Sequence, residues 1–345
     1  GGGPVYYIKA AFPNGFGKFL AGFFSVAIIL ALGFMGNMVQ SNSISDAMYN
    51  AFGVPKIVVG VAVALVAGFI FLGGVQRIVS VTEKLVPVMA LLYIVGSLAV
   101  LVCNWRNLPG VFVSIFTAAF NPSAVLGGAA GITVQKAMRF GVARGLFSNE
   151  AGVGSAPNAA ASAHVSHPAK QGLVQMLSVF IDTLLICSAT AFMLLCSGVE
   201  PTKGLEGAPY VQAALQNVFG AAGPVFITVA MVLFAFTTLI GNLYYVDNAL
   251  NYIVGRVPSR EFMVLFRINA MIVIFIGAGQ SIDLVWNLAD VLMGLMALIN
   301  LPVILILARP ALDAMKDYST QRKAGKNPVF KAKDIGLEGK TEYWQ

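Results

Sequence analysis

Long apolar runs, separated by short polar segments, dominate the chain. A run of about 20 apolar residues is enough for one helix to cross a lipid bilayer. The pattern predicts eight such spans, at residues 18–46, 55–74, 85–103, 132–163, 173–196, 224–253, 262–277 and 284–307. We therefore expect an all-α polytopic membrane protein with one helical domain, residues 1–307, and a tail, residues 308–345. The tail is polar and rich in lysine, which predicts a solvated, partly disordered end.

The fourth apolar run is interrupted by residues 145–157, with the sequence GLFSNEAGVGSAP. Gly and Pro open the hydrogen-bond ladder of a helix, and Ser148, Asn149 and Ser155 can accept bonds from freed N–H groups. Irregular backbone at membrane depth survives only when it is buried in protein or lines a polar cavity. The segment therefore predicts a discontinuous helix, which in secondary transporters binds substrate and ions. The alternative is an ordinary loop between two helices.

Composition supports the membrane assignment. The chain is 58% hydrophobic and 11% charged, whereas soluble domains carry about 25% charged residues. Its net charge of +7 does not indicate a nucleic-acid surface, because many basic residues lie in the tail and in short loops, as membrane topology requires. Placing Lys9, Lys18, Lys170 and Arg256 in the cytoplasm also places the tail there. This predicts a multi-pass protein of the cell membrane, the bacterial inner membrane, and the tail can also contact anionic lipid.

Several polar residues within the apolar runs are candidates for function. Gln40 either bonds a neighbouring helix or contacts a substrate. The adjacent hydroxyls of Thr237 and Thr238 either bond their own helix or offer two hard oxygens to a small cation. Trp286 and Asp290 are four residues apart and share a helix face. An ionisable group inside a span indicates function, although Asp290 can also bond a neighbouring helix and Trp286 can be an interface anchor.

Other residues in the spans favour structural roles. Phe147 either packs in the core or closes over a substrate. Asp182 is expected to pair with Arg139 or Arg144, and Asn300 is a further buried polar candidate. His164 and His167 have no third ligand nearby, which favours a loop over a zinc site. Three cysteines without a Cys-x-x-Cys spacing indicate neither a metal centre nor a disulfide framework. No catalytic motif is present, so we expect no enzyme and no cofactor.

The word GLFSNEAGVGSAP resembles the signature of the sodium:alanine (alanine or glycine:cation) symporter family. Segments 1–8 (GGGPVYYI), 36–40 (GNMVQ) and 285–290 (VWNLAD) are similar to that family too, in the same order. The resemblance covers nearly the whole chain and implies a leucine-transporter-type fold of two inverted five-helix repeats. Family members begin with further helices, including a broken first core helix. The resemblance therefore implies an N-terminally incomplete copy with its first helices missing.

The resemblance also implies a function: sodium-coupled import of alanine, glycine or a similar small neutral amino acid, with no cofactor beyond the coupling ion. It implies that substrate is contacted by Gln40, Phe147, Ser148, Asn149, Gly152, Trp286 and Asp290. By the same likeness, Thr237 and Thr238 are expected to bind sodium. The sequence does not decide whether the substrate is alanine, glycine or serine, or whether the coupling ion is sodium or a proton. The alternative functions are a non-transporting membrane scaffold and an inactive fragment of a transporter.

Overall fold

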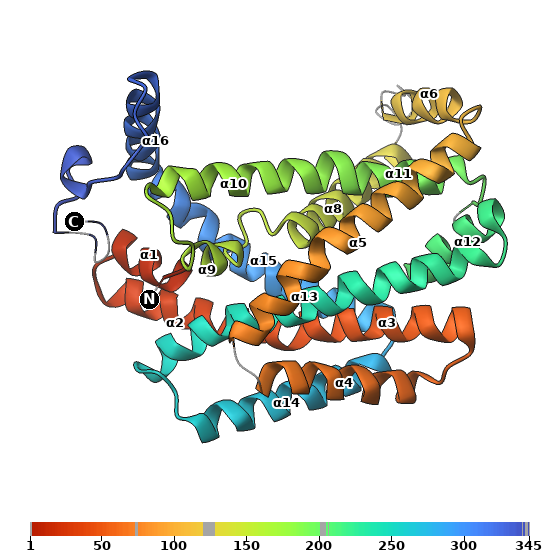
Figure 1. Ribbon diagram of the computed structural model, residues 1–345, viewed down its shortest axis with the longest axis horizontal. Coiled ribbons are helices and arrows are strands. Elements are labelled where there is room, and N and C mark those ends of the chain that lie inside the picture. Colours follow the sequence, from red (N-terminus) through yellow and green to blue (C-terminus); the bar gives the residue numbers. More distant parts are fainter. Residues whose placement is uncertain are drawn as a thin grey trace.

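The computed structural model describes residues 2–72, 75–119, 128–200, 205, 207–339, 341 and 344. All regular elements in these ranges are helices, which confirms the all-α prediction (Figure 1). Six helices in the described part are long and apolar enough to span a membrane: Gly15–Phe52, Thr82–Cys103, Pro168–Cys196, Ala222–Val254, Arg260–Ala278 and Ile282–Ile306. Each overlaps one predicted span. The other two predicted spans correspond to α4 (Lys56–Leu72), a shorter helix of 17 residues, and to an interrupted helix.

The first long helix contains α2 (Gly15–Ile28), a π-helical segment η1 (Ile29–Gly36) and α3 (Asn37–Phe52). Asn14 caps its start by accepting a hydrogen bond from the N–H of Gly17, and Gly53 ends it with a left-handed φ of 68°. At the end of η1, the buried amide of Asn37 donates to the carbonyl of Gly33 at 2.9 Å. π-Helical segments inside α-helices are rare and are frequent at functional sites.

The last part of this long helix, α3, has a counterpart in the long helix α13 (Ala222–Val254), and the two run in opposite directions. Asn37 near the start of α3 accepts a bond from Asn242 in the second half of α13, while Ala47 lies against Thr228 in its first half. Likewise α4 packs antiparallel to α14 (Arg260–Ala278). In chain order, α3 and α4 are followed by the long helix α5 (Val75–Cys103), and α13 and α14 are followed by the long helix α15 (Ile282–Ile306).

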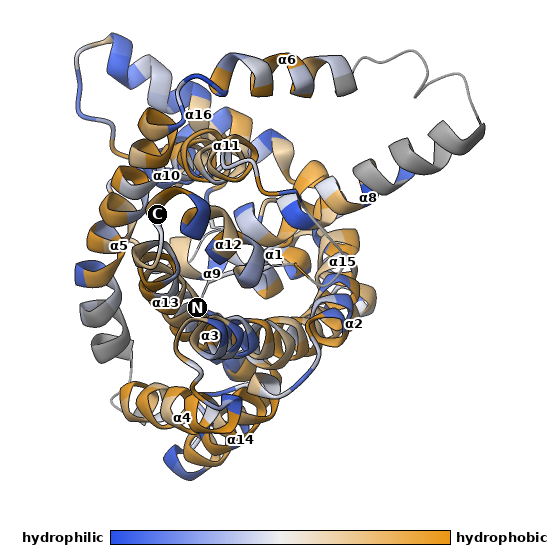
Figure 2. Ribbon diagram, turned by 90° about the vertical axis from the view of Figure 1, so that its right-hand side faces the viewer, coloured by the Kyte–Doolittle hydropathy of each residue, from blue (hydrophilic) through white to orange (hydrophobic). Residues whose placement is uncertain are grey.

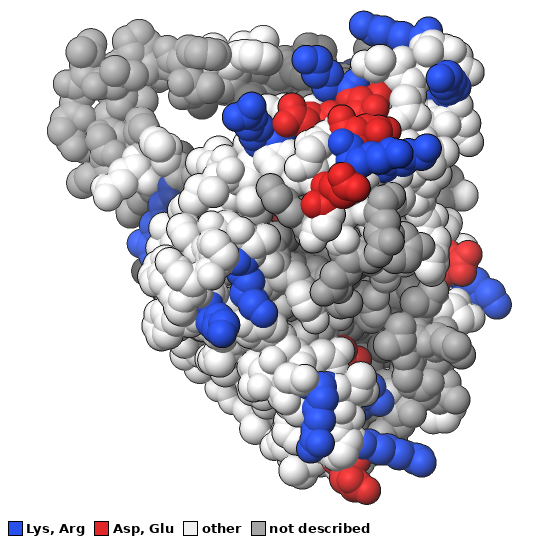
Figure 3. Space-filling view, turned by 90° about the vertical axis from the view of Figure 1, so that its left-hand side faces the viewer, with Lys and Arg blue, Asp and Glu red and all other residues white. Residues whose placement is uncertain are grey.

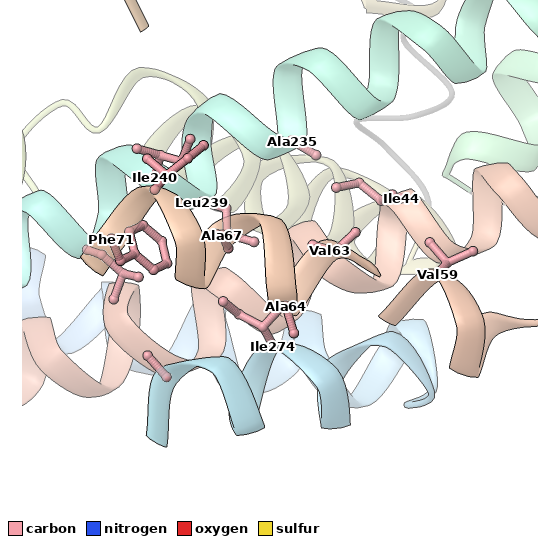
Figure 4. Packing of buried hydrophobic residues seen from close by; sticks show 13 residues of the cluster. Ile44, Val59, Val63, Ala64, Ala67, Phe71, Ala235, Leu239, Ile240 and Ile274 are labelled. Carbon is pink, nitrogen blue, oxygen red and sulfur yellow. The ribbon is translucent and has the colours of Figure 1, made fainter. Parts of the chain in front are cut away.

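These paired helices enclose one of the apolar cores of the molecule. Figure 4 shows Ile44 of α3, Val63 and Ala67 of α4, Leu239 of α13 and Ile274 of α14 packed together. The contact between α4 and α14 depends on a small residue, because a Cβ atom on Gly60 would lie 2.7 Å from that of Ala278. Small residues let helices approach closely in lipid, where packing replaces the hydrophobic effect as the main attraction.

Six further helical segments lie outside these pairs. They are α1 (Pro4–Ala11), α6 (Leu108–Ala119), α10 (Pro168–Ile181), η2 (Asp182–Cys187), α11 (Ser188–Cys196) and α12 (Ala208–Phe219). Figure 2 views the bundle from one end and shows α4 and α14 as mostly hydrophobic along their length. Large apolar side chains are exposed on the outside, such as Ile57 at 68% and Leu298 at 72%. An outer surface of this kind is suited to contact with lipid tails.

The tail differs from its prediction, because its first part is a folded helix, α16 (Ala308–Lys323). Beyond it, the N–H of Phe330 donates to the carbonyl of Ser166 at 2.9 Å. His167 is fully buried there, with Nε2 3.2 Å from a carboxylate oxygen of Asp317, and its Nδ1 accepts from the N–H of Ala169. The tail is thus ordered by packing on the loop before α10, which tail composition alone does not reveal.

Basic residues gather at the end of the bundle that carries α1, α16 and both termini. Figure 3 looks at this end and shows many lysine and arginine side chains, with acidic groups among them. Lys9 lies on α1, Lys18 on α2, Lys170 on α10, and Arg256 in the connection between α13 and α14. These elements meet at the left-hand end of Figure 1.

Candidate functional site

The predicted discontinuity is present between α8 (Gly128–Asn149) and α9 (Ala156–Ala160). Glu150, Gly152 and Gly154 have left-handed φ angles of 51°, 79° and 93°, so the chain turns repeatedly before helix resumes. The opening is shorter than predicted, because α8 continues to Asn149. Phe147, Ser148 and Asn149 therefore lie in the last turn of α8 and not in the unwound part, where the sequence placed them. The last four carbonyls of such a helix have no partner within it.

Two elements far away in the sequence hold the opening in shape. Asn300 of α15 donates its amide to the carbonyl of Gly152 at 2.9 Å, and its Oδ1 accepts from the hydroxyl of Tyr7 on α1 at 2.6 Å. Gly154 is enclosed, because a Cβ there would lie 2.9 Å from the Phe24 ring and 3.1 Å from Cγ of Asn300. The glycines are thus needed both for their φ angles and for close approach.

The end of α8 is docked on η2, the π-helical segment that follows α10. The hydroxyl of Ser148 donates to Asp182 at 2.6 Å, and that of Thr183 donates to Oδ1 of Asn149 at 2.8 Å. The expected pairing of Asp182 with Arg139 or Arg144 is therefore wrong. The physical reason is that Arg144 has a carboxylate closer to it on another helix.

That carboxylate is Asp290 of α15, with which Arg144 forms an ion pair. The guanidinium also lies over the ring of Trp286, with Cζ 3.9 Å from the ring centroid, a cation–π arrangement. Phe147 also packs against Trp286, with 4.5 Å between ring centroids. Trp286 and Asp290 share a helix face as predicted. Arg144, the partner of both residues, was missed from the sequence. A cation within an apolar run was the available signal.

Two hollows lie along α8 and α15. The larger, which we call the break cavity, has a volume of about 890 Å³ and extends from Gly3 and Ala161 to the opening. Its lining includes Tyr7, Asn149, Glu150, Gly152, Gln175 and Asn300. The smaller, the Trp286 cavity, has about 320 Å³ and is lined by Phe140, Arg144, Asp283, Trp286, Asn287 and Asp290 among others. Phe147 lies on α8 between the residues that line the two cavities.

The other predicted site residues lie on α3 and α13. Gln40 is buried. It follows Met38 and Val39, which pack with Phe147 and Trp286 in one cluster.

The two threonines of α13 differ in exposure. Thr237 is buried and Thr238 is exposed, and both hydroxyls bond the carbonyl of Phe234 in their own helix. The hydroxyl of Thr237 also lies 3.6 Å from the sulfur of Met89 on α5. The structure therefore brings Phe147 and Trp286 into direct contact and joins Asp290 to Trp286 through Arg144, whereas Thr237 contacts Met89 instead.

Membrane-length helices around a helix that opens into a polar-edged cavity are the features of a multi-pass membrane transporter. The family model described as the sodium:alanine symporter family matches residues 1–332, and the chain belongs to that family. It is thus a transporter and not an enzyme, in a family for which sodium is the coupling ion.

Named relatives cover the whole chain or nearly all of it. The amino-acid carrier protein AlsT of Bacillus subtilis (strain 168) is 44% identical over 345 residues, which are 100% of this chain and 71% of AlsT. The probable sodium/glutamine symporter GlnT of the same organism is 40% identical, over 99% of this chain and 70% of GlnT. The sodium/alanine symporter AgcS of Methanococcus maripaludis is 38% identical, over 93% of this chain and 70% of AgcS. These names differ in the amino acid they state.

Proposed function

We propose that this protein imports alanine, or a similar small neutral amino acid such as glycine, across the cell membrane together with sodium. The observation that carries the proposal is the opened helix at Gly152, whose backbone borders the break cavity. A zwitterion suits such an opening, because freed N–H groups can bind its carboxylate and freed carbonyls its ammonium group. Sodium/alanine symport is also stated in the name of AgcS.

The substrate site is proposed to lie on the α8 side of the opening. Gly152 and the last turn of α8, with Ser148 and Asn149, present backbone groups to the substrate. Phe147 and Trp286, already in ring contact, close over its small side chain. Gln40 of α3 supplies an amide beside the same aromatic cluster. Asp290 acts from the Trp286 cavity through its pairing with Arg144.

The sodium site is proposed to use the hydroxyl oxygens of Thr237 and Thr238. Hydroxyl and carbonyl oxygens are hard ligands of the type that small cations prefer. A hydroxyl that donates to its own helix still offers lone pairs to an ion. Two neighbouring oxygens on one helix thus provide the start of a cation site.

We infer further that the helices form a leucine-transporter-type inverted repeat. Its support is the order of long helix, shorter helix and long helix, found in Gly15–Phe52, α4 and α5 and again in α13, α14 and α15. The pairs α3 with α13 and α4 with α14 are antiparallel, as inverted repeats require. Alternating access would then rock one set of helices against the other.

The orientation is proposed from charge. The end that carries α1 and α16 is rich in lysine and arginine, and basic loops face the cytoplasm in membrane proteins. The tail would therefore be cytoplasmic, close to anionic lipid headgroups that attract its lysines. The break cavity, which reaches Gly3, then extends toward the cytoplasm.

Counterflow in proteoliposomes tests the transport proposal. Vesicles loaded with unlabelled alanine should accumulate labelled alanine from outside only when sodium is present on both sides. Glycine should compete, and glutamine measures how strictly the site selects small side chains. Equal accumulation with sodium and with choline would exclude sodium coupling, and no accumulation above empty vesicles would exclude transport of alanine.

A further inference from the structure

Glu150 is a carboxylate in the middle of the opened helix, and among the described residues it forms no ion pair. It follows the last residue of α8 directly and lines the break cavity. Within the described part of the chain, its carboxylate accepts one hydrogen bond, from the hydroxyl of Ser155 at 2.6 Å. Arg144, the nearest arginine along the chain, is engaged by Asp290 instead. An ionised group at membrane depth is costly and indicates function by default.

The backbone of Glu150 strengthens this inference. Its φ of 51° makes it the one non-glycine residue with left-handed φ among those the structure describes. The position just after a helix normally takes Gly, or sometimes Asn, because other side chains are strained there. Strained backbone persists at functional sites when the surroundings hold it in place. A glutamate therefore occupies a position where glycine would be easier, which points to a use for its carboxylate.

The titratable groups near Glu150 do not hold its carboxylate in the ionised form. Tyr7 of α1 lines the same cavity, Tyr245 of α13 lies within electrostatic range, and both phenols are neutral in ordinary conditions. Asp182 of η2 reaches α8 through Ser148, two residues before Glu150. None of these groups is a cation that would hold Glu150 permanently ionised.

We propose that Glu150 is a proton-binding site of the transport cycle, ionised while amino acid and sodium occupy the opening and protonated while the empty carrier returns. This proposal rests on the proposed symport. The proton comes from the aqueous phase that reaches the break cavity, binds a carboxylate oxygen of Glu150, and is given up to water on the opposite side of the membrane. Each import cycle then moves one proton outward. The empty carrier returns to its outward-facing state without a buried charge at Glu150.

The test uses the protein in sodium-driven proteoliposomes that contain a pH-sensitive dye. The wild type should make the lumen more alkaline during alanine uptake. Its uptake rate should change as internal pH passes through the titration of the carboxylate. Glu150→Gln and Glu150→Gly should lose both the lumenal signal and the pH dependence. Both should retain counterflow, because exchange does not require the empty carrier to return. Glycine also relieves the strained φ, so this variant separates a backbone role from a carboxylate role.

Ser155→Ala supplies a graded readout. The Ser155 hydroxyl donates to the carboxylate and so favours its ionised form. Removing one such bond should move the midpoint of the pH profile upward by about one unit without abolishing it.

Three results would overturn the proposal. The first is a wild-type pH profile and lumenal signal in both Glu150 variants. The second is an unchanged lumen pH in every protein together with a raised sodium requirement in Glu150→Gln, which would make Glu150 a sodium ligand. The third is a wild type without sodium-driven uptake, which would overturn the symport itself.

Discussion

Arg144 of α8 and Asp290 of α15 form an ion pair beside the ring of Trp286, on the α8 side of the helix opening. Ten residues further along α15, Asn300 bonds the carbonyl of Gly152 within the opening. Helix α15 therefore contacts the interrupted helix at two places. The ion pair lines the Trp286 cavity, and Asn300 lines the break cavity. The ion pair is the more exposed of these two contacts.

Arg144→Ala should loosen the Trp286 cavity. The side chains of Arg144 and Asp290 are 40% and 29% exposed, so solvent screens the pair and its stability contribution is about 1 kcal/mol or less. We expect little loss of thermal stability and faster labelling of Asn287→Cys by a polar thiol reagent, in a background without the native cysteines. Exchanging the two charges, with Arg144→Asp and Asp290→Arg together, should restore slow labelling. Unchanged labelling in Arg144→Ala would show that the pair does not close this cavity.

Alanine at Gly152 or Gly154 should weaken transport while leaving expression largely intact. A Cβ at Gly152 would lie 2.7 Å from Leu301, and both positions have φ angles that L-residues disfavour by about 1 kcal/mol or more. Gly145→Ala is the matched control, because it lies on α8 with open space around its Cβ position. Alanine binding can be measured by scintillation proximity. Binding equal to the wild type in both variants would contradict a substrate site shaped by this backbone.

Tyr7→Phe should destabilise the protein through Asn300. The phenol hydroxyl donates to Oδ1 of Asn300, which in turn holds the carbonyl of Gly152. Removing the hydroxyl leaves a buried acceptor unpaired, at a cost of about 1–3 kcal/mol. Thermal unfolding in detergent should occur several degrees lower, and Asn300→Ala should add little more in the double variant because the two residues act as one chain. Additive losses would indicate independent roles.

Replacing Thr237 and Thr238 together by Val should raise the sodium concentration for half-maximal uptake. Valine keeps the shape of threonine and removes the oxygen that a cation would bind. Because both hydroxyls bond carbonyls of their own helix, their loss should leave α13 folded. Uptake that keeps the wild-type sodium dependence would remove these residues from the ion site. Ser114→Ala on α6, another hydroxyl bonded to its own helix, serves as a control.

The sequence predicted features that depend on local chemistry. Apolar runs located each of the long helices, and the glycines of residues 145–157 located the opening, since both follow from what a single segment can do in lipid. The exact end of α8 was missed, because Phe147, Ser148 and Asn149 have no strong preference against helix. Their helical state is decided by docking on Asp182 and Thr183, which lie about 35 residues away.

Contacts between distant helices were beyond sequence reasoning. The sequence suggested Asp182 as a partner for Arg144, and only the relative placement of α8, η2 and α15 shows that Asp290 takes that place. The connection from Tyr7 to Gly152 through Asn300 joins residues almost 300 positions apart, with no periodic pattern to indicate it. The folded tail has the same origin, because its order comes from the loop around His167.

The contact of the tail with His167 offers a way to follow the protein at work. Helix α16 follows α15 with only Leu307 between them, and Asp317 of α16 contacts His167 at the start of α10. The tail therefore connects α15 and α10, two helices whose residues line the break cavity. Fluorophores on the exposed Lys323 and on the α10 side would form a distance gauge for α10 and α15 that needs no label within the bilayer. A bulky fusion partner attached to the C-terminus would disturb the contact between the tail and His167, so tags belong elsewhere.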